Sequence, residues 1–166
     1  MVELAVVGAK NSGKTTVVEG LVSYLVGEGY RVATVKHTSH SHRFDTRGKD
    51  SYRHRQAGAG LTVAVSDEEV AIFTRPDLLD ICQLQHITRR QIDIWIIEGD
   101  WQADRPKVLV TRHLKELPGT LPDNVVATIG PERVSEVPAH FEAGDHGGLG
   151  SLVSSTILDK KTETRE

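Results

Sequence analysis

This sequence has a single cysteine in 166 residues, which excludes an internal disulfide and a zinc site built from several cysteines. An excess of basic charge is also lacking. With 20 Lys and Arg against 23 Asp and Glu, the net charge of −3 does not suit a general binder of nucleic acid or of membrane surfaces. No apolar run is long enough to span a bilayer, and the N-terminus lacks the basic region and long apolar run of a signal peptide. We therefore expect a cytoplasmic protein that binds neither nucleic acid nor membrane.

The rest of the composition is that of an ordinary globular chain. Hydrophobic residues make up 38% and charged residues 26%, and the length favours one domain over two. We predict a single domain over residues 1–166, with residues 160–166 as a frayed, charged tail. Cys82 ends the apolar stretch LLDIC, for which we predict a helix, and we expect its side chain to be buried.

The most informative stretch is GAKNSGKTT at residues 8–16, which matches the phosphate-binding loop (P-loop) pattern G-x-x-x-x-G-K-[ST]. An apolar run at residues 4–7 predicts a buried strand before it, and an amphipathic pattern at residues 15–25 predicts a helix after it. In that context, the N–H groups of the loop and the helix N-terminus would hold the β- and γ-phosphates of a nucleotide. Lys14 would add a full positive charge, and the Thr15 hydroxyl would bind Mg²⁺.

Strand and helix patterns alternate along the chain and predict an α/β fold. We expect a mostly parallel sheet flanked by helices, as in P-loop nucleotide-binding proteins, with further strands at residues 31–35, 92–97, 107–111 and 125–129. Two runs rich in β-branched residues, 61–65 and 70–74, predict an antiparallel hairpin appended to that sheet. Further helices are expected at residues 49–57, from Pro76-Asp77 onward, and at residues 149–160.

A P-loop usually works with an acidic residue near the end of a buried strand, which holds Mg²⁺ directly or through a water. Glu98 is the best candidate for that catalytic and metal-binding role, because the most apolar strand of the chain delivers it to the carboxyl edge of the sheet. Asp100 is a weaker candidate. Asp93 starts the same strand, so we expect it at the opposite edge as a strand-entry carboxylate.

Residues 36–55 form a basic, histidine-rich segment. From residue 31 to residue 55 there are seven Lys or Arg and two Asp, which are Asp45 and Asp50. The first half of the segment should be a loop at the same sheet edge as the P-loop. Three interpretations stay open: a surface that recognises anions, which we rank first, a solvated loop, and a Zn²⁺ or Ni²⁺ site made by His37, His40 and His42. Each aspartate could position Mg²⁺ or a water, or could pair with a nearby arginine.

Three blocks within residues 2–112 are distinctive: VVGAKNSGKTT, GYRVATVKHTSHSHRFDTRGKDSYRHRQAGA and DIWIIEGDWQADRPKVLVTR. Together they resemble MobB, the GTP-binding adaptor family of molybdenum-cofactor biosynthesis. The middle block is the specific part, because many unrelated functions share a P-loop. The resemblance implies a P-loop fold that forms a homodimer, binds GTP with Mg²⁺ and hydrolyses GTP slowly. It also implies association with molybdopterin and with the molybdenum cofactor guanylyltransferase, the enzyme that joins molybdopterin to GMP.

The resemblance also implies roles for single residues. Thr15 and Glu98 would bind Mg²⁺, while Lys36, His37 and Lys49 would lie near the γ-phosphate or the pterin phosphate. Asp50, in the same block, is the second catalytic candidate. The residues that would hold the GTP phosphates are Gly8, Lys10, Asn11, Ser12, Gly13, Lys14, Thr15 and Thr16. The sequence contains no Asn-Lys-x-Asp, the motif that recognises guanine in many GTP-binding proteins. The residues alone therefore do not assign the base of the bound nucleotide.

Two alternatives from other functional classes stay open. The histidine-rich segment also fits a nickel or zinc metallochaperone GTPase. The P-loop by itself fits a small-molecule kinase, which would need an arginine-rich lid and a base for the substrate hydroxyl. For the implied homodimer, the hairpin at residues 61–74 is the candidate pairing element, since exposed strand edges recruit partners.

Overall fold

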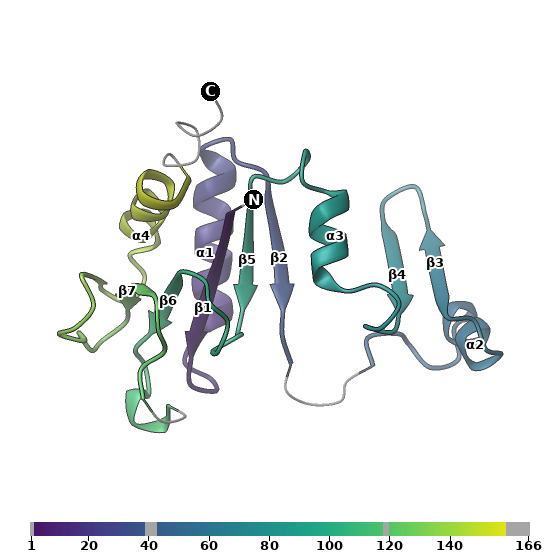
Figure 1. Cartoon of the computed structure of the whole chain (residues 1–166), viewed down its shortest axis with the longest axis horizontal. Helices are drawn as coiled ribbons and strands as arrows, with labels where there is room; N and C mark the ends of the chain where they lie inside the picture. Colours follow the sequence, from purple (N-terminus) through teal and green to yellow (C-terminus); the bar gives the residue numbers. More distant parts are fainter. Residues whose placement is uncertain (1, 39–42, 118–119, 159–166) are drawn as a thin grey trace. The chain divides into compact units, whose positions relative to one another are not determined.

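The computed structural model describes residues 2–38, 43–117 and 120–158, and the chain divides into two compact units. The first unit comprises Met1–His37 and Arg90–Glu166, and the second comprises Thr38–Arg89. Figure 1 labels most of the helices and strands of both units. A single domain stays a prediction, and the predicted frayed tail lies outside the described residues. Within the described ranges, no helix is long and apolar enough to cross a membrane.

The first unit is built on a sheet of six parallel strands in the order β2-β5-β1-β6-β7-β8, of which Figure 1 labels all but β8. The strand bounds are Val2–Gly8 (β1), Val32–Lys36 (β2), Ile94–Glu98 (β5), Lys107–Val110 (β6), Val125–Ile129 (β7) and Ala139–Phe141 (β8). The predicted α/β fold with a mostly parallel sheet is confirmed. β8 is an additional strand, and its three residues after Pro138 are too few to show a strand period. Because β1 lies between β5 and β6, the loop that follows it starts at the middle of the sheet edge.

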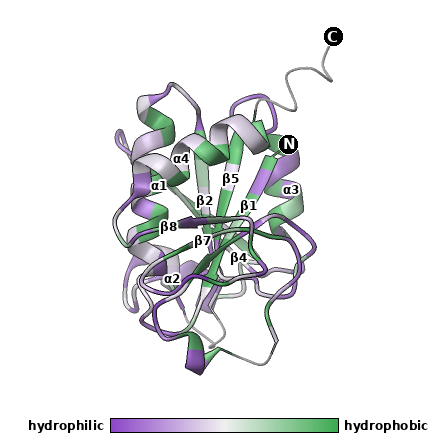
Figure 2. Cartoon of the chain, turned by 90° about the vertical axis from the view of Figure 1, so that its left-hand side faces the viewer, coloured by the Kyte–Doolittle hydropathy of each residue, from purple (hydrophilic) through white to green (hydrophobic). Residues whose placement is uncertain are grey.

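Side chains alternate along β1 and bury both of its faces. Leu4 and Val6 lie in one hydrophobic core with α1 (Lys14–Gly27) and α4 (His146–Val153), so these two helices cover the same face. Ala5 and Val7 lie in a second cluster, which the loops and the 3-10 helix η1 (Leu114–Glu116) cover. In Figure 2 the hydrophobic colour runs along β5 and parts of β1, whereas β8 is drawn in the hydrophilic colour. Burying a Leu or Val side chain stabilises a fold by about 1.5–3 kcal/mol, so the strand before the P-loop is firmly anchored.

The close packing of α1 and α4 depends on glycine. A Cβ added at Gly150 of α4 would lie 2.3 Å from Cδ1 and 2.5 Å from Cγ of Tyr24, which is on α1. A Cβ at Gly20 of α1 would lie 2.3 Å from the ring of His146 on α4. No carbon atom fits at such distances, so the two helix axes approach closely only because both positions lack a side chain.

We predict that Gly150→Ala lowers the free energy of unfolding by about 1–3 kcal/mol, because the new methyl group must displace the base of the Tyr24 ring. Gly147→Ala is the matched control in the same helix, since a Cβ there meets nothing within 4 Å. It should leave the protein unchanged or stabilise it by about 0.5–1 kcal/mol through helix propensity. Urea unfolding of both variants measures the difference, and equal stability of the two would contradict the close-packing argument.

The second unit contains α2 (Asp50–Gln56), β3 (Leu61–Val65), β4 (Val70–Thr74) and α3 (Ile81–Ile87). β3 and β4 form a separate two-stranded antiparallel sheet, which confirms the predicted hairpin. The turn between the strands is closed by Ser66, whose hydroxyl accepts hydrogen bonds from the N–H groups of Glu68 and Glu69. α2 ends before Gly58, as the sequence predicts.

Three predictions about helices were wrong in detail. α3 begins at Ile81 and not at Pro76-Asp77, because Asp80 and Gln83 form a capping box that fixes its first turn. Cys82 is helical but exposed, since this short helix buries Gln85 instead. α4 begins at His146 and not at Leu149, because the Asp145 carboxylate accepts a hydrogen bond from the N–H of Gly148. A π-helix, η2 (Ser154–Leu158), follows α4, and the predicted end of this last helix near residue 160 lies outside the described residues.

Candidate functional site

The P-loop connects the end of β1 to the start of α1 and leaves the helix N-terminus open. Gly13, the residue before α1, has a φ of 98°, and no side chain caps the first turn. No acidic residue lies in that turn either. The free N–H groups and the helix dipole therefore favour an anion at this position. The structure is thus compatible with the phosphate-binding role that the motif predicts.

Lys14 lies against the loop itself. Its Nζ donates hydrogen bonds to the carbonyl oxygens of Gly8, at 3.1 Å, and of Ala9, at 2.6 Å. Burial lowers the pKa of Lys14 below its ordinary value, the nearby Glu98 carboxylate opposes that shift, and the positive charge of Lys36 adds to it. A lysine whose charge is poorly solvated gains more from a bound phosphate than an exposed lysine would.

Glu98, at the end of β5, contacts side chains from α1 and β2 at the carboxyl edge of the sheet. The Thr15 hydroxyl, at the start of α1, lies 3.1 Å from Oε1 and 3.0 Å from Oε2 of Glu98. The Nζ of Lys36, at the end of β2, lies 3.1 Å from Oε1. β2 pairs with β5 in a register that sets Lys36 beside Glu98. A hydroxyl and a carboxylate are the hard oxygen ligands that Mg²⁺ prefers, so this pair fits the predicted metal site.

The other predicted residues of this unit surround that cluster. The N–H of His37 donates to the Glu98 carbonyl at 3.0 Å, which extends the edge beyond β2. Ser12 is 3% exposed, and its hydroxyl has no hydrogen-bond partner among the described residues. Lys10, Asn11 and Thr16 are exposed around the loop. Asp100, the weaker candidate, forms an ion pair with Arg105 at 3.3 Å.

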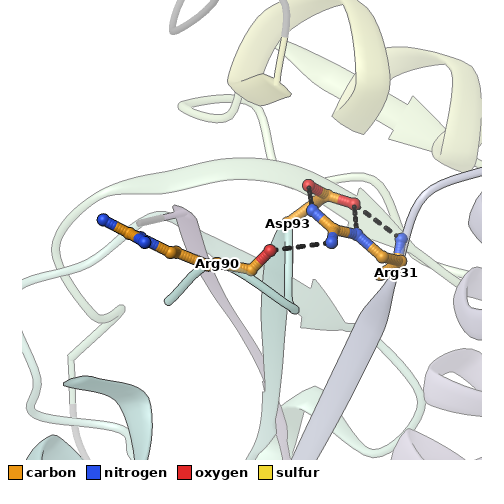
Figure 3. A network of polar contacts seen from close by, with 3 residues as sticks. All are labelled: Arg31, Arg90 and Asp93. Atoms are coloured by element: carbon orange, nitrogen blue, oxygen red, sulfur yellow. Dashed lines mark hydrogen bonds and ion pairs between the residues drawn. The ribbon is translucent and has the colours of Figure 1, made fainter. Parts of the chain in front are cut away.

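Asp93 lies at the other end of the same strand, as predicted. Figure 3 shows its carboxylate facing Arg31, whose guanidinium donates to both carboxylate oxygens, at 3.0 and 2.8 Å. A third hydrogen bond joins the same guanidinium to the Arg90 carbonyl at 2.8 Å. This network ties the start of β2 to the start of β5 and gives Asp93 a structural role at the amino edge.

Lys49 and Asp50 belong to the second unit. Lys49 precedes the first turn of α2, and Asp50 lies 3.5 Å from Arg53. Their roles toward a nucleotide stay predictions. Asp45 is buried and accepts hydrogen bonds from Ser51 and Arg55, at 2.9 and 3.3 Å, so Asp45 pairs with a nearby arginine as one of its interpretations predicts.

The metal interpretation of the histidine-rich segment depends partly on His40 and His42, which lie outside the described residues. Among the residues that the structure does describe, no group of three or more His, Cys, Asp and Glu could hold a metal ion.

A cavity of about 310 Å³ adjoins the P-loop and was not predicted. Gly13 and Thr16 form one wall of it, Arg112 and Gly130 follow the ends of β6 and β7, and His146 begins α4. Gly130 has a φ of 133°, and a Cβ there would lie 2.6 Å from the Thr111 hydroxyl, so the two strand ends are packed tightly. The sequence signal that could have pointed to this cavity is the position of its residues directly after predicted strands, because the residues that follow parallel strands gather at the carboxyl edge of the sheet.

Comparison with known proteins gives a consistent result. The family model described as molybdopterin guanine dinucleotide synthesis protein B matches residues 3–130. The chain is 36% identical over 123 residues to the molybdopterin-guanine dinucleotide biosynthesis adapter protein of Haemophilus influenzae, covering 72% of this chain and 67% of that protein. It is 35% identical to a putative adapter protein of the same name from Methanocaldococcus jannaschii, covering 66% of this chain and 47% of that protein.

A solved structure supports the same assignment along almost the whole length. The crystal structure of Bacillus subtilis MobB matches with a TM-score of 0.73 and 28% sequence identity, covering 95% of this chain and 98% of that one. The family model covers well over half of the chain and includes the P-loop, Lys36 and Glu98. The chain therefore belongs to the MobB family, the family of molybdopterin guanine dinucleotide synthesis protein B.

Proposed function

We propose that this protein is a GTP-binding adaptor with weak GTPase activity that serves the synthesis of the guanine dinucleotide form of the molybdenum cofactor. The observation that carries the proposal is the contact of Thr15 and Lys36 with Glu98 beside an uncapped P-loop. The adapter role is the one that the names of the H. influenzae and M. jannaschii relatives give.

The chain's own groups account for binding and for slow hydrolysis. Lys14 and the N–H groups of the loop would hold the phosphates, and Thr15 with Glu98 would hold Mg²⁺, which neutralises developing charge on the phosphates. Hydrolysis requires a water to attack the terminal phosphorus, while the bond to the bridging oxygen breaks. The nearest carboxylate, Glu98, is already engaged by Thr15 and Lys36 and is therefore a poor base for that water. Slow turnover follows from this arrangement.

The cavity beside Gly13 and Thr16 supports a whole nucleotide as the ligand, because it offers space for a nucleoside next to the phosphate loop. Arg112 contributes a planar guanidinium that can stack on a base. Titration calorimetry with GTP, ATP and GDP in the presence of Mg²⁺ tests which nucleotide base the protein prefers. We expect GTP and GDP to bind and ATP to bind at least tenfold more weakly, and a clear preference for ATP would overturn the GTP assignment.

The adaptor role needs a partner, and we assign it to the enzyme that joins molybdopterin to GMP. A homodimer is part of the same proposal. The hairpin β3-β4 supports a dimer contact, because Val65, Val70 and Ile72 are 73%, 62% and 46% exposed on a two-stranded sheet. Light scattering in solution measures the mass of the particle, and a monomer at all concentrations tested would remove the dimer from the proposal.

The affinity for the nucleotide should fall as the pH rises in the alkaline range. Because the pKa of Lys14 is lowered from 10.5, its amino group loses its proton at a lower pH than an ordinary lysine does. Bound phosphates raise that pKa again, so nucleotide binding takes up protons between the two pKa values, and affinity falls as pH rises through the pKa of the free protein. Calorimetry in alkaline buffers of different ionisation enthalpy counts the protons. Lys14→Arg is the control. Because arginine stays charged throughout this pH range, nucleotide binding to this variant should take up no proton at residue 14.

A further inference from the structure

The second unit contains a cavity of its own, of about 360 Å³, that no P-loop residue lines. Arginine side chains come to it from three segments: Arg43 from the chain before α2, Arg55 from α2, and Arg75 from the position directly after β4. Tyr52 adds a hydroxyl, and residues 56 and 58–60 complete the wall. The lining holds three guanidinium groups and no carboxylate.

Arg55 is held in place by contacts on both sides. Its Nη1 lies 3.3 Å from the Asp45 carboxylate, whose side chain is only 2% exposed, and its guanidinium carbon lies 5.8 Å from the centre of the Phe73 ring. The Ser51 hydroxyl donates to the other oxygen of Asp45 at 2.9 Å. An arginine fixed in this way loses little side-chain entropy when a ligand binds.

The other two arginines are also oriented by side-chain contacts. Arg75 makes a two-point ion pair with Asp77, with Nε–Oδ1 and Nη2–Oδ2 distances of 3.1 and 2.9 Å. Arg43 Nη1 lies 3.5 Å from the Tyr52 hydroxyl oxygen. Both aspartates that balance the arginines, Asp45 and Asp77, lie outside the lining of the cavity. The charged side chains of the cavity wall are therefore all arginines.

The C-terminal end of α2 lies at this cavity, and its partial negative charge has to be considered. Its last carbonyl oxygens would repel an anion if they were free. They are instead engaged, because the carbonyls of Arg53, His54 and Arg55 accept hydrogen bonds from the N–H groups of Ala57, Ala59 and Gly58. Three of the last carbonyls of α2 are therefore engaged within the chain, and the arginines supply the charged side chains of the cavity wall.

We propose that this cavity binds the phosphate group of an organic phosphate monoester. Guanidinium groups match phosphate oxygens in geometry and charge, and a site with three of them favours a dianion over a carboxylate. The volume exceeds that of a free phosphate ion, so an attached organic group has room. This second anion site is independent of GTP binding at the P-loop.

The test uses the full chain with the Lys14→Ala substitution, which weakens phosphate binding at the P-loop. Phenyl phosphate is the probe, and the backbone amides are followed by ¹H–¹⁵N NMR. We expect the amides of Gly58, Ala59 and Gly60 to shift in a saturable way, with benzoate producing no matching shift. The double substitution Arg43→Gln and Arg75→Gln should weaken phenyl phosphate binding at least tenfold. Arg55 is kept, because its loss would leave the buried Asp45 unpaired.

Arg89→Gln is the matched control, since Arg89 is exposed in the same unit and does not line the cavity. It should bind phenyl phosphate as the parent does. Shifts confined to the P-loop amides, or equal binding by the double variant and the parent, would overturn the proposal. Failure of GTP to bind the unsubstituted protein would overturn the proposed function and leave this site untouched, so the two failures are distinguishable.

Discussion

Lys14→Ala is expected to weaken GTP binding by about 100-fold or more. The removed ammonium group faces the position of two phosphates, and a hydrogen bond to a charged group contributes about 1.5–3 kcal/mol. In the free protein, Lys14 donates hydrogen bonds to the carbonyls of Gly8 and Ala9, and water can replace its ammonium group there. Titration calorimetry with GTP and Mg²⁺ measures the loss.

Stability should be preserved in the same variant, because alanine suits the first turn of a helix. Circular dichroism and urea unfolding check that point. Lys115→Ala is the matched control, since Lys115 is an exposed lysine of η1. If Lys14→Ala bound GTP as tightly as the parent and the control do, the P-loop would not be the nucleotide site.

Glu98→Gln is expected to reduce the Mg²⁺-dependent rate of GTP hydrolysis by roughly 10- to 100-fold, while GTP affinity changes by about threefold at most. Glutamine keeps the size of the side chain and can still accept a hydrogen bond from Thr15. It loses the negative charge that would hold Mg²⁺ and that now pairs with Lys36. Without that charge, a bound Mg²⁺ would have one ligand less to hold it while charge develops on the phosphates.

Phosphate release under single-turnover conditions, together with calorimetry, separates the rate from the affinity. Asp93→Asn is the control, because it removes a carboxylate from the other end of the same strand, where Asp93 faces Arg31. That variant should lose some stability and keep its hydrolysis rate. Equal losses of rate and affinity in Glu98→Gln would assign Glu98 a purely structural role.

Local patterns were sufficient for much of the fold. The P-loop, the hairpin β3-β4 and the strand that ends at Glu98 were all predicted, because turn chemistry and periodicity act over a few residues. The errors also have local causes. α3 starts at Ile81 because Asp80 and Gln83 form a capping box, whose Asp-x-x-Gln spacing is present in the sequence. Cys82 is exposed because residue type alone does not say which side of a short helix is covered.

Sequence patterns were thus enough to predict a P-loop on an α/β fold and to place Glu98 at the end of a buried strand. Which side chains meet, however, follows from the order and packing of the strands and helices. Lys36 reaches Glu98 because β2 pairs with β5, and the register sets these two residues side by side although they lie far apart in the sequence. The cavity beside the P-loop and the three-arginine cavity are likewise assembled from distant segments. The physical reason is that strand order and helix packing depend on burial over the whole chain, which no short stretch of sequence records.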